Sequence, residues 1–300
     1  MRVTSTRAGY FFTSINWRDY LALCKIKVVV VMLITSIIGM LLASTSFVGF
    51  AVLFWGNLGI ALCACAAAAV NHVVDREIDA KMSRTHNRPI ASGKVPALNA
   101  LLFAAFLALV GQAVLIVFVN ELTAYLTLAS LLGYALVYTL FLKRATPQNI
   151  VIGGIAGAAP PLLGWTAVTN SVDGGALLLV LIIFAWTPPH FWALAVYKRD
   201  EYAKAGVPML PVTHGIRYTK LHILFYTLIL FAVSLLPFST QMFSWIYLFG
   251  AVILGFGFLL YALKLLFTTD NKIALSTFKY SINYLLILFV FMLLDHYLLI

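Results

Sequence analysis

The chain has 300 residues, of which 63% are hydrophobic and only 10% are charged, with a formal net charge of +10. Soluble domains are typically about 45–50% apolar and about 25% charged, so this composition excludes a soluble globule and a disordered chain. The apolar runs are long and unbroken, whereas a transmembrane β-barrel would alternate in polarity over segments of about ten residues. The sequence therefore predicts an all-α fold, a polytopic bundle of membrane-spanning helices.

Nine segments are apolar enough to cross the hydrocarbon core, for which a helix needs about 20 residues. They cover residues 27–46, 50–71, 97–118, 122–142, 149–168, 175–196, 221–238, 243–266 and 278–298. We expect one membrane domain over residues 1–300. The connections 72–96 and 197–220 are much longer than the other turns and strongly charged. Such connections in a compact bundle are usually functional, so we predict that they are active-site loops.

All 20 Lys and Arg residues fall on one side of this arrangement. The acids Glu121, Asp173 and Asp295 fall on the other side. Basic loops face the cytoplasm, which predicts a cytoplasmic N-terminus, cytoplasmic active-site loops and an external C-terminus. The positive charge is thus explained by topology, with the lipid bilayer as partner and no nucleic acid. No apolar stretch begins before residue 27, so we expect no cleavable signal peptide and a bacterial inner membrane, with the mitochondrial inner membrane as the alternative.

The first long connection begins with three oxygen-bearing side chains at four-residue spacing, Asn71, Asp75 and Asp79. On a helix these residues share one face, called the acidic face below. Their oxygens repel one another unless a cation lies between them, and Mg²⁺ commonly bridges such ligands to phosphate oxygens. The acidic face is therefore a predicted Mg²⁺ site, with Asp75 and Asp79 as catalytic residues. The alternative is a solvated loop whose acids pair with its bases.

Basic side chains follow the acidic face at three- and four-residue spacing: Lys81, Arg84 and Arg88. A carboxylate cluster next to a cationic cluster suits a Mg²⁺-bound diphosphate, with the metal on one side and guanidinium groups on the other. We predict that these three bases and Asn71 bind a diphosphate, and that Arg84 and Arg88 act in catalysis.

Small residues open the fifth span at Gly153, Gly154 and Gly157. Small residues allow helices to approach closely, and they also leave room for a flat substrate. We favour the packing role for these glycines. The three cysteines, Cys24, Cys63 and Cys65, form neither a disulfide framework nor a zinc pattern, so they are expected to be packing residues.

The sixth span carries His190 directly after Pro188 and Pro189. Two consecutive prolines are expected to break or kink the helix and to leave backbone carbonyls without donors. An ionisable side chain at membrane depth is a candidate functional group, so we predict a catalytic role for His190. The alternative is that its imidazole caps one of the freed carbonyls.

The second long connection places acids and bases together at the inner mouth of the bundle. Asp200 is an acid at the inner mouth, and it is predicted to act in catalysis and as a further metal ligand. The neighbouring bases are predicted to bind the diphosphate; they are Lys198, Arg199 and Lys204.

These motifs resemble the UbiA superfamily of membrane prenyltransferases, and the likeness covers nearly the whole chain. The pattern N-x-x-x-D-x-x-x-D followed by M-x-R-T-x-x-R-P runs from Asn71 to Pro89. The stretch from Pro189 to Pro211 is similar to the haem-modifying branch. Lys204 stands where the general second motif, another D-x-x-x-D, has an acid. This departure weakens a second two-carboxylate Mg²⁺ site and argues against branches with aromatic acceptors.

The resemblance implies that a farnesyl group passes from farnesyl diphosphate to a vinyl group of protohaem IX (haem B), which gives haem O for haem–copper oxidases. Mg²⁺ and the bases would neutralise the departing diphosphate, and the vinyl group would capture the allylic cation. The candidate haem-binding residues are His190, His72 and Tyr197. Haem A synthase and the assembly of a terminal oxidase are the suggested partners.

Two other functions stay open from the sequence. One is a prenyltransferase of the same fold with a quinone or chlorophyllide acceptor, against which the stretch after His190 argues. The other is a haem transporter. Transporters place ionisable residues near the membrane midplane, whereas most acids here cluster at the inner mouth.

Overall fold

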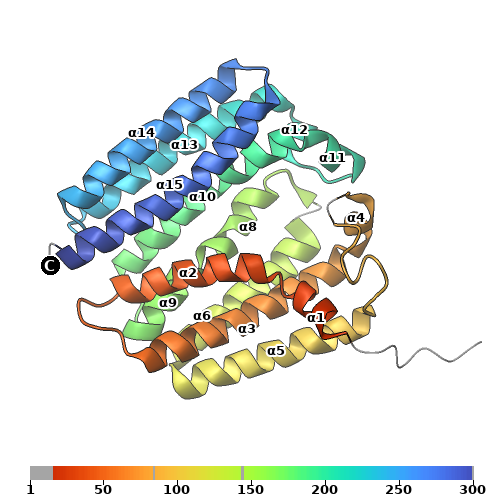
Figure 1. Cartoon of the computed structure of the whole chain (residues 1–300), viewed down its shortest axis with the longest axis horizontal. Coiled ribbons are helices and arrows are strands. Elements are labelled where there is room, and N and C mark those ends of the chain that lie inside the picture. Colours follow the sequence, from red (N-terminus) through yellow and green to blue (C-terminus); the bar gives the residue numbers. More distant parts are fainter. Residues whose placement is uncertain (1–15, 84, 143–144, 299–300) are drawn as a thin grey trace, which may run out of the picture.

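The computed structural model describes residues 16–83, 85–142 and 145–298, and these residues form helices joined by loops. Figure 1 shows the helices side by side in one bundle. Their bounds are α1 Trp17–Leu23, α2 Ile26–Leu42, α3 Phe50–Val74, α4 Arg76–Lys81, α5 Ala97–Phe118, α6 Glu121–Leu132, η1 (a π-helix) Gly133–Leu142, α8 Asn149–Ala158, α9 Pro160–Thr169, α10 Gly174–Tyr197, α11 Arg199–Lys204, α12 Leu210–Thr213, α13 Ile216–Ser239, α14 Trp245–Phe267 and α15 Asn271–Leu298.

Over the described residues, eight helical segments are long and apolar enough to span a membrane, and the bent pair α1–α2 makes a ninth. The pairs α6–η1 and α8–α9 each form one of these spans. The predicted all-α bundle of nine spans is confirmed when the bent pair is counted as one span. The bend between α1 and α2 is 51°.

Several helix ends differ from the predicted bounds. The second span does not end at residue 71, because α3 continues to Val74 and α4 follows it directly. The seventh begins at Ile216 instead of 221, while α2 ends at Leu42 instead of 46. At α3 and α13, the apolar run marks only the part of the helix that meets lipid, whereas backbone hydrogen bonding continues into polar residues. The two long connections therefore contain the short helices α4, α11 and α12.

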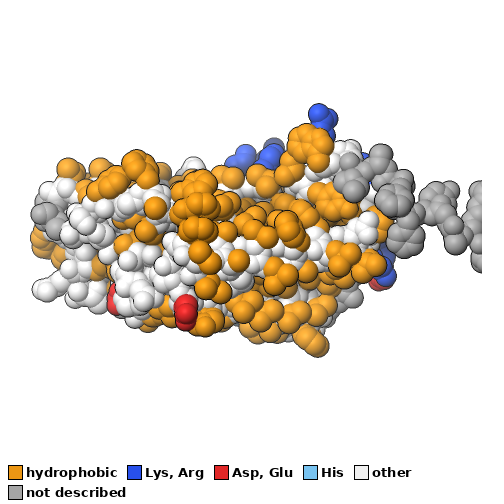
Figure 2. Space-filling view, turned by 90° about the horizontal axis from the view of Figure 1, so that it is seen from below, with side chains coloured by type: hydrophobic (Ala, Val, Ile, Leu, Met, Phe, Trp, Pro, Cys, Tyr) orange, Lys and Arg blue, Asp and Glu red, His pale blue; other side chains and the backbone are white. Residues whose placement is uncertain are grey.

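The short helices gather at one end of the bundle. In Figure 1, α1, α4, α11 and α12 lie at the right, and α15 ends on the left. The two predicted active-site segments therefore lie at the same end of the molecule. The sides of the bundle are apolar: Figure 2 shows one face on which hydrophobic side chains predominate. Large exposed side chains such as Phe106 and Leu109 suit contact with lipid.

The last helix closes the bundle against the first long one. The His296 Nε2 atom lies 3.0 Å from the backbone oxygen of Ser44, and the Tyr297 hydroxyl donates to the Leu41 oxygen at 3.1 Å. Asp295 is buried and accepts hydrogen bonds from the backbone N–H groups of Ser244 and Tyr247 at 2.7 and 2.8 Å. This carboxylate thus satisfies donors at the start of α14, which a helix otherwise leaves without partners.

Two glycines bring the backbones of α2 and α9 into direct contact. A Cβ atom on Gly164 would overlap the Ser36 carbonyl oxygen, and one on Gly39 would overlap the Pro161 carbonyl oxygen. The predicted packing role also holds for Gly153, which abuts the Tyr138 ring, and Gly154, which faces Thr187. For Gly157 it is wrong, because no atom lies within 4 Å of the position of a Cβ.

Candidate active site at the charged end of the bundle

The acidic face exists as one continuous helical surface. The backbone N–H of Asp75 donates to the Asn71 oxygen at 2.9 Å, and that of Asp79 donates to the Asp75 oxygen at 2.8 Å. The four-residue spacing therefore carries through the junction of α3 and α4. All three side chains are buried, at 3%, 1% and 4% exposure. Buried carboxylates require compensating cations or donors, so this face is built to hold positive charge.

Arg88 supplies one such positive charge. Its Nη1 atom donates to both carboxylate oxygens of Asp79, each at 2.8 Å. The segment that carries Arg88 is held against α4 by the Thr85 hydroxyl, which donates to the Asp79 backbone oxygen at 3.0 Å. Two residues predicted to act on a metal and on a diphosphate thus form a charge pair at the same place. Arg84 lies outside the described residues, and Lys81 is exposed.

Lys25 supplies a second positive charge that the sequence pattern did not reveal. It adopts the left-handed conformation, with φ of 48°, at the bend between α1 and α2. This bend directs the side chain across to α3, where the ammonium group donates to Asn71 Oδ1. The Asn71 amide in turn lies 3.4 Å from the Thr139 hydroxyl of η1. In the sequence, Lys25 is one of several basic residues that membrane topology already explains. No sequence pattern therefore marked it as a residue of the site.

The donor set of the acidic face fits a magnesium ion shared with a substrate. No group of three His, Cys, Asp or Glu side chains in the described part of the chain is arranged to hold a metal alone. The face offers two carboxylates and one amide oxygen, and cationic groups already contact Asn71 and Asp79. Mg²⁺ usually binds one or two carboxylates and takes its remaining ligands from water and substrate phosphates. The residues present match that mode and not an all-protein cage.

The charged residues of α11 and Lys198, which directly precedes it, bind mainly to one another. Lys198 pairs with Glu201 at 2.7 Å, and Arg199 pairs with Asp200 at 3.4 Å while its Nε donates to the Pro211 oxygen at 3.1 Å. The Asp200 side chain is 86% exposed. Lys204 and Tyr197 are also exposed. The structure therefore places the predicted residues of α11 at the surface, unlike those of the acidic face.

An apolar cluster nevertheless joins the two active-site segments. Met82, which follows α4, belongs to the same buried cluster as Met209 and Leu210. Ile78 of α4 and Tyr202 of α11 pack against this cluster. The two segments predicted to form the site thus lie together, although they are more than 100 residues apart in the sequence.

Of the break or kink predicted before His190, the break is wrong, because the helix is continuous there. Helix α10 runs through both Pro188 and Pro189 to Tyr197. Lost donors are tolerated inside a membrane bundle when neighbouring helices pack around them. The imidazole does not cap a freed carbonyl through Nδ1, because this atom lies 2.6 Å from the Ser281 hydroxyl on α15.

The environment of His190 fixes its tautomer. The Ser281 hydroxyl donates to the Phe278 backbone oxygen at 2.6 Å, so its oxygen acts as the acceptor toward His190. Nδ1 of the imidazole then carries the hydrogen, and Nε2 keeps its lone pair. The ring is stacked between Trp186, at 4.1 Å, and Phe278, at 4.5 Å. A neutral imidazole held in this way can ligate a metal or accept a proton through Nε2.

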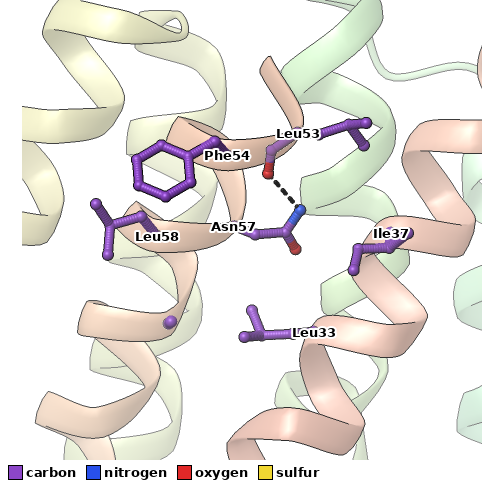
Figure 3. A pocket seen from close by; sticks show the side chains of 7 residues that line it. Leu33, Ile37, Leu53, Phe54, Asn57 and Leu58 are labelled. Atoms are coloured by element: carbon purple, nitrogen blue, oxygen red, sulfur yellow. Dashed lines mark hydrogen bonds between the residues drawn. The ribbon is translucent and has the colours of Figure 1, made fainter. Parts of the chain in front are cut away.

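Two pockets differ sharply in chemistry. One, of about 310 Å³, lies beside the acidic face and is lined by Ala22, Lys25, His72, Asn87, Arg88 and Pro89. The other, of about 380 Å³, lies between α2 and α3 and has mainly apolar walls. Figure 3 shows its single polar lining residue, Asn57, donating to the Leu53 backbone oxygen, at 2.7 Å. Asn57 lies 18 residues before Asp75 along the chain. Because an α-helix rises about 1.5 Å per residue, the two residues are roughly 27 Å apart, and the apolar pocket is separate from the site.

Comparison with known proteins identifies close relatives. Residues 32–291 match the profile of the UbiA prenyltransferase family. The chain is 67% identical to the protoheme IX farnesyltransferase of Teredinibacter turnerae, over 95% of this chain and 92% of that protein. It is also 67% identical to the protoheme IX farnesyltransferase of Marinobacter nauticus, over 95% of this chain and 94% of the relative.

Solved structures show the same fold at low sequence identity. A digeranylgeranylglyceryl phosphate synthase superposes with a TM-score of 0.79 at 21% identity, covering 94% of this chain and 98% of its own. A UbiA homologue from Archaeoglobus fulgidus, bound to GPP and Mg²⁺, superposes with a TM-score of 0.62 at 17% identity, covering 91% and 99%.

Proposed function

The chain belongs to the UbiA prenyltransferase family and is a membrane prenyltransferase, and from this premise we propose that it transfers a farnesyl group from farnesyl diphosphate to a vinyl group of protohaem IX, giving haem O. The observation that supports this proposal is the buried acidic face, on which Arg88 donates to Asp79. The similar proteins named protoheme IX farnesyltransferase support the choice of acceptor. No other part of the described chain combines buried carboxylates with a cationic lining in this way.

The proposed mechanism begins with binding of the diphosphate at the charged end. Asn71, Asp75 and Asp79 would hold Mg²⁺, and the chemistry it would supply there is neutralisation of the negative charge on the departing diphosphate. Arg88 is positioned to donate to phosphate oxygens, because in the described structure it uses only Nη1 for Asp79. Arg84 is proposed for the same role from its place in the sequence. Asp75 and Asp79 are buried, and a site shielded from bulk water would protect the allylic cation until the vinyl group attacks it.

The acceptor side of the site is proposed at α10. When the vinyl group attacks the farnesyl cation, the positive charge passes to the carbon beside the haem ring, and water adds there to give the hydroxyl group of haem O. The Nε2 atom of His190 would either accept the proton that this water loses or ligate the haem iron. His72 and Tyr197 are weaker candidates for haem contact, because His72 lies in the cationic pocket and Tyr197 is 40% exposed. Asp200 and the bases of α11 are proposed to attract anionic substrates rather than to coordinate the metal, because their side chains are exposed or paired locally.

The orientation in the membrane is also a proposal. The chain is polytopic, and its bacterial relatives fit an inner membrane. We place the end with α4 and α11 in the cytoplasm, since basic segments are retained there. Haem O would then pass to haem A synthase or to the assembly of a terminal oxidase.

A haem pigment profile tests the proposed acceptor. Membranes from a bacterium that lacks its own farnesylated haem should gain haem O when this chain is expressed, and only haem B should be present without it. A quinone or chlorophyllide acceptor would instead leave the haem profile unchanged while a prenylated quinone or pigment accumulates. A transporter would change the distribution of haem B across the membrane and produce no new haem.

Replacing His190 by Ala is expected to reduce haem O formation by about 100- to 10,000-fold, in the range attributed to a positioned acid–base group. If Nε2 ligates iron, the variant should also lose haem affinity and shift the Soret band, while binding of farnesyl diphosphate is retained. Ser281→Ala, which removes only the tautomer-fixing contact, should give a smaller change in the same direction. If both variants bind and convert haem as the wild type does, His190 has no role at the acceptor site.

A further inference from the structure

Two histidines and a tyrosine form a stacked row around the start of α13. His214, Tyr218 and His222 recur at four-residue spacing. The centroid of the Tyr218 ring lies 5.2 Å from that of His214 and 4.1 Å from that of His222. His214 and Tyr218 are exposed, and His222 is half-buried. This row, called the His–Tyr–His row below, is therefore accessible from outside the bundle, and none of its members lines the pocket beside the acidic face.

The tautomer of His222 is fixed by its own helix. Its Nδ1 atom lies 3.0 Å from the Tyr218 backbone oxygen, and a carbonyl oxygen can only accept a hydrogen bond. In the neutral ring, Nδ1 therefore carries the hydrogen and Nε2 keeps its lone pair. Histidines that ligate a metal are commonly oriented in this way, with the second ring nitrogen donating to a carbonyl or a carboxylate. His222 is thus prepared to ligate a metal centre through Nε2.

The surroundings of His222 suit a flat apolar ligand better than a bare ion. Leu221 and Phe225 are 48% and 58% exposed beside it, on a helix that spans the membrane. No group of three His, Cys, Asp or Glu side chains within the described ranges could hold an ion here. His214 does not close on the same ion as His222, because the tyrosine ring packs against both imidazoles. A metalloporphyrin needs few protein ligands, since the macrocycle holds the iron and the protein supplies only axial groups.

Charge complementarity gives such a ligand an orientation. The Arg217 side chain is exposed, three residues after His214 and four residues before Leu221. It therefore lies toward the charged end of the bundle, whereas the exposed apolar side chains lie farther along α13. Guanidinium groups form strong, often bidentate hydrogen bonds with carboxylates. A porphyrin that carries carboxylate side chains would place them at Arg217 and its apolar edge toward the lipid.

We propose that the His–Tyr–His row is a loading site for protohaem on the lipid-facing surface, where His222 ligates the iron through Nε2 and Arg217 binds a propionate. The proposal rests on the proposed function for its ligand, but it describes a second haem position. The Trp192 ring, which meets the His222 ring edge-on at 6.0 Å, follows His190 by only two residues on α10. Residues two apart point to different sides of an α-helix, so His190 and His222 serve separate positions.

The test is a titration of the purified full-length protein in detergent with ferric protohaem, without farnesyl diphosphate, followed by the Soret band. His222→Ala should weaken binding at one haem position by at least about 10-fold, since even a group that only orients a metal ligand contributes about 10- to 100-fold to affinity. His86→Ala is the matched control, because His86 is also exposed and its Nδ1 also lies near a backbone oxygen, at 2.7 Å from Ser83. His214→Phe should retain binding, since its ring can still pack on Tyr218. His190→Ala should leave the haem at the His–Tyr–His row in place.

Kinetics provide the second readout. His222→Ala should raise the KM for haem by a similar factor, with a much smaller effect on kcat and on the KM for farnesyl diphosphate. Its unfolding temperature without haem should equal that of His86→Ala, which separates loss of a ligand from loss of the fold.

Equal haem affinity in His222→Ala and His86→Ala would overturn the loading site, and so would equal losses in His222→Ala and His214→Phe. The row would then only anchor α13 at the membrane surface, as aromatic side chains do elsewhere. This failure is distinct from failure of the proposed function. A protein that binds haem through His222 but forms no farnesylated haem would retain the loading site and refute the activity.

Discussion

Asp75→Asn should lower the rate of prenyl transfer by at least about 100-fold while the protein still folds into the membrane. The substitution keeps the size of the side chain but removes a negative charge from a site that is 1% exposed. Preorganised charges that act on a leaving group typically contribute about 100- to 1,000-fold to the rate. The measurement is the initial rate of product formation at saturating farnesyl diphosphate and Mg²⁺, with protein quantified in the membrane fraction.

Glu77→Gln is the matched control for this variant. Glu77 lies on the same short helix as Asp79, but its side chain is exposed and lies off the acidic face. Both variants lose one carboxylate from the same segment, so a general effect of charge would reduce both rates equally. Wild-type turnover by Asp75→Asn, or equal losses in the two variants, would refute a specific role of the acidic face.

Gly164→Ala should destabilise the bundle by about 3 kcal/mol or more. A Cβ atom there would overlap the Ser36 carbonyl oxygen and lie 2.8 Å from its carbon. Backbone atoms cannot move aside by changing a rotamer, so α2 and α9 would have to separate. Overpacking in a well-packed interior typically costs about 1–3 kcal/mol, and occasionally more. The measurement is the thermal unfolding temperature in detergent.

Gly157→Ala provides the control in the same span. No atom lies within 4 Å of the Cβ position at Gly157, and alanine favours the helix by up to about 1 kcal/mol. This variant should therefore unfold at the wild-type temperature or slightly above it. If Gly164→Ala unfolds at the same temperature as Gly157→Ala, the close contact between α2 and α9 does not stabilise the bundle.

The helical bundle and the acidic face were predictable because both depend on short-range periodicity. An apolar run of about 20 residues has one structural solution in a membrane, and four-residue spacing places side chains on one face of any helix. The bounds of α3 and α13 were less predictable, since hydrogen bonding continues where hydrophobicity ends. The break predicted at Pro188 did not occur, because packing by neighbouring helices offsets the missing backbone donors.

Contacts between distant segments could not be predicted from the pattern. Lys25 reaches Asn71 across 46 residues, through a left-handed residue that no local motif announces. The role of Gly164 depends on the path of α2, whereas the more conspicuous Gly157 has no close neighbour. The charged residues from Lys198 onward suggested a substrate-binding role. The sequence does not reveal that Lys198 and Arg199 instead form ion pairs with acids of the same segment. Such features require the three-dimensional arrangement.

The most direct test of the proposed function is product analysis with the purified protein in liposomes. Haem B, farnesyl diphosphate and Mg²⁺ are added, and the haem fraction is analysed by mass spectrometry. We expect a new haem whose mass exceeds that of haem B by one farnesyl group and one hydroxyl group, formed together with inorganic diphosphate and abolished by chelation of Mg²⁺. Recovery of unmodified haem B alone, from protein that binds both substrates, would contradict the assignment of protohaem IX as the acceptor.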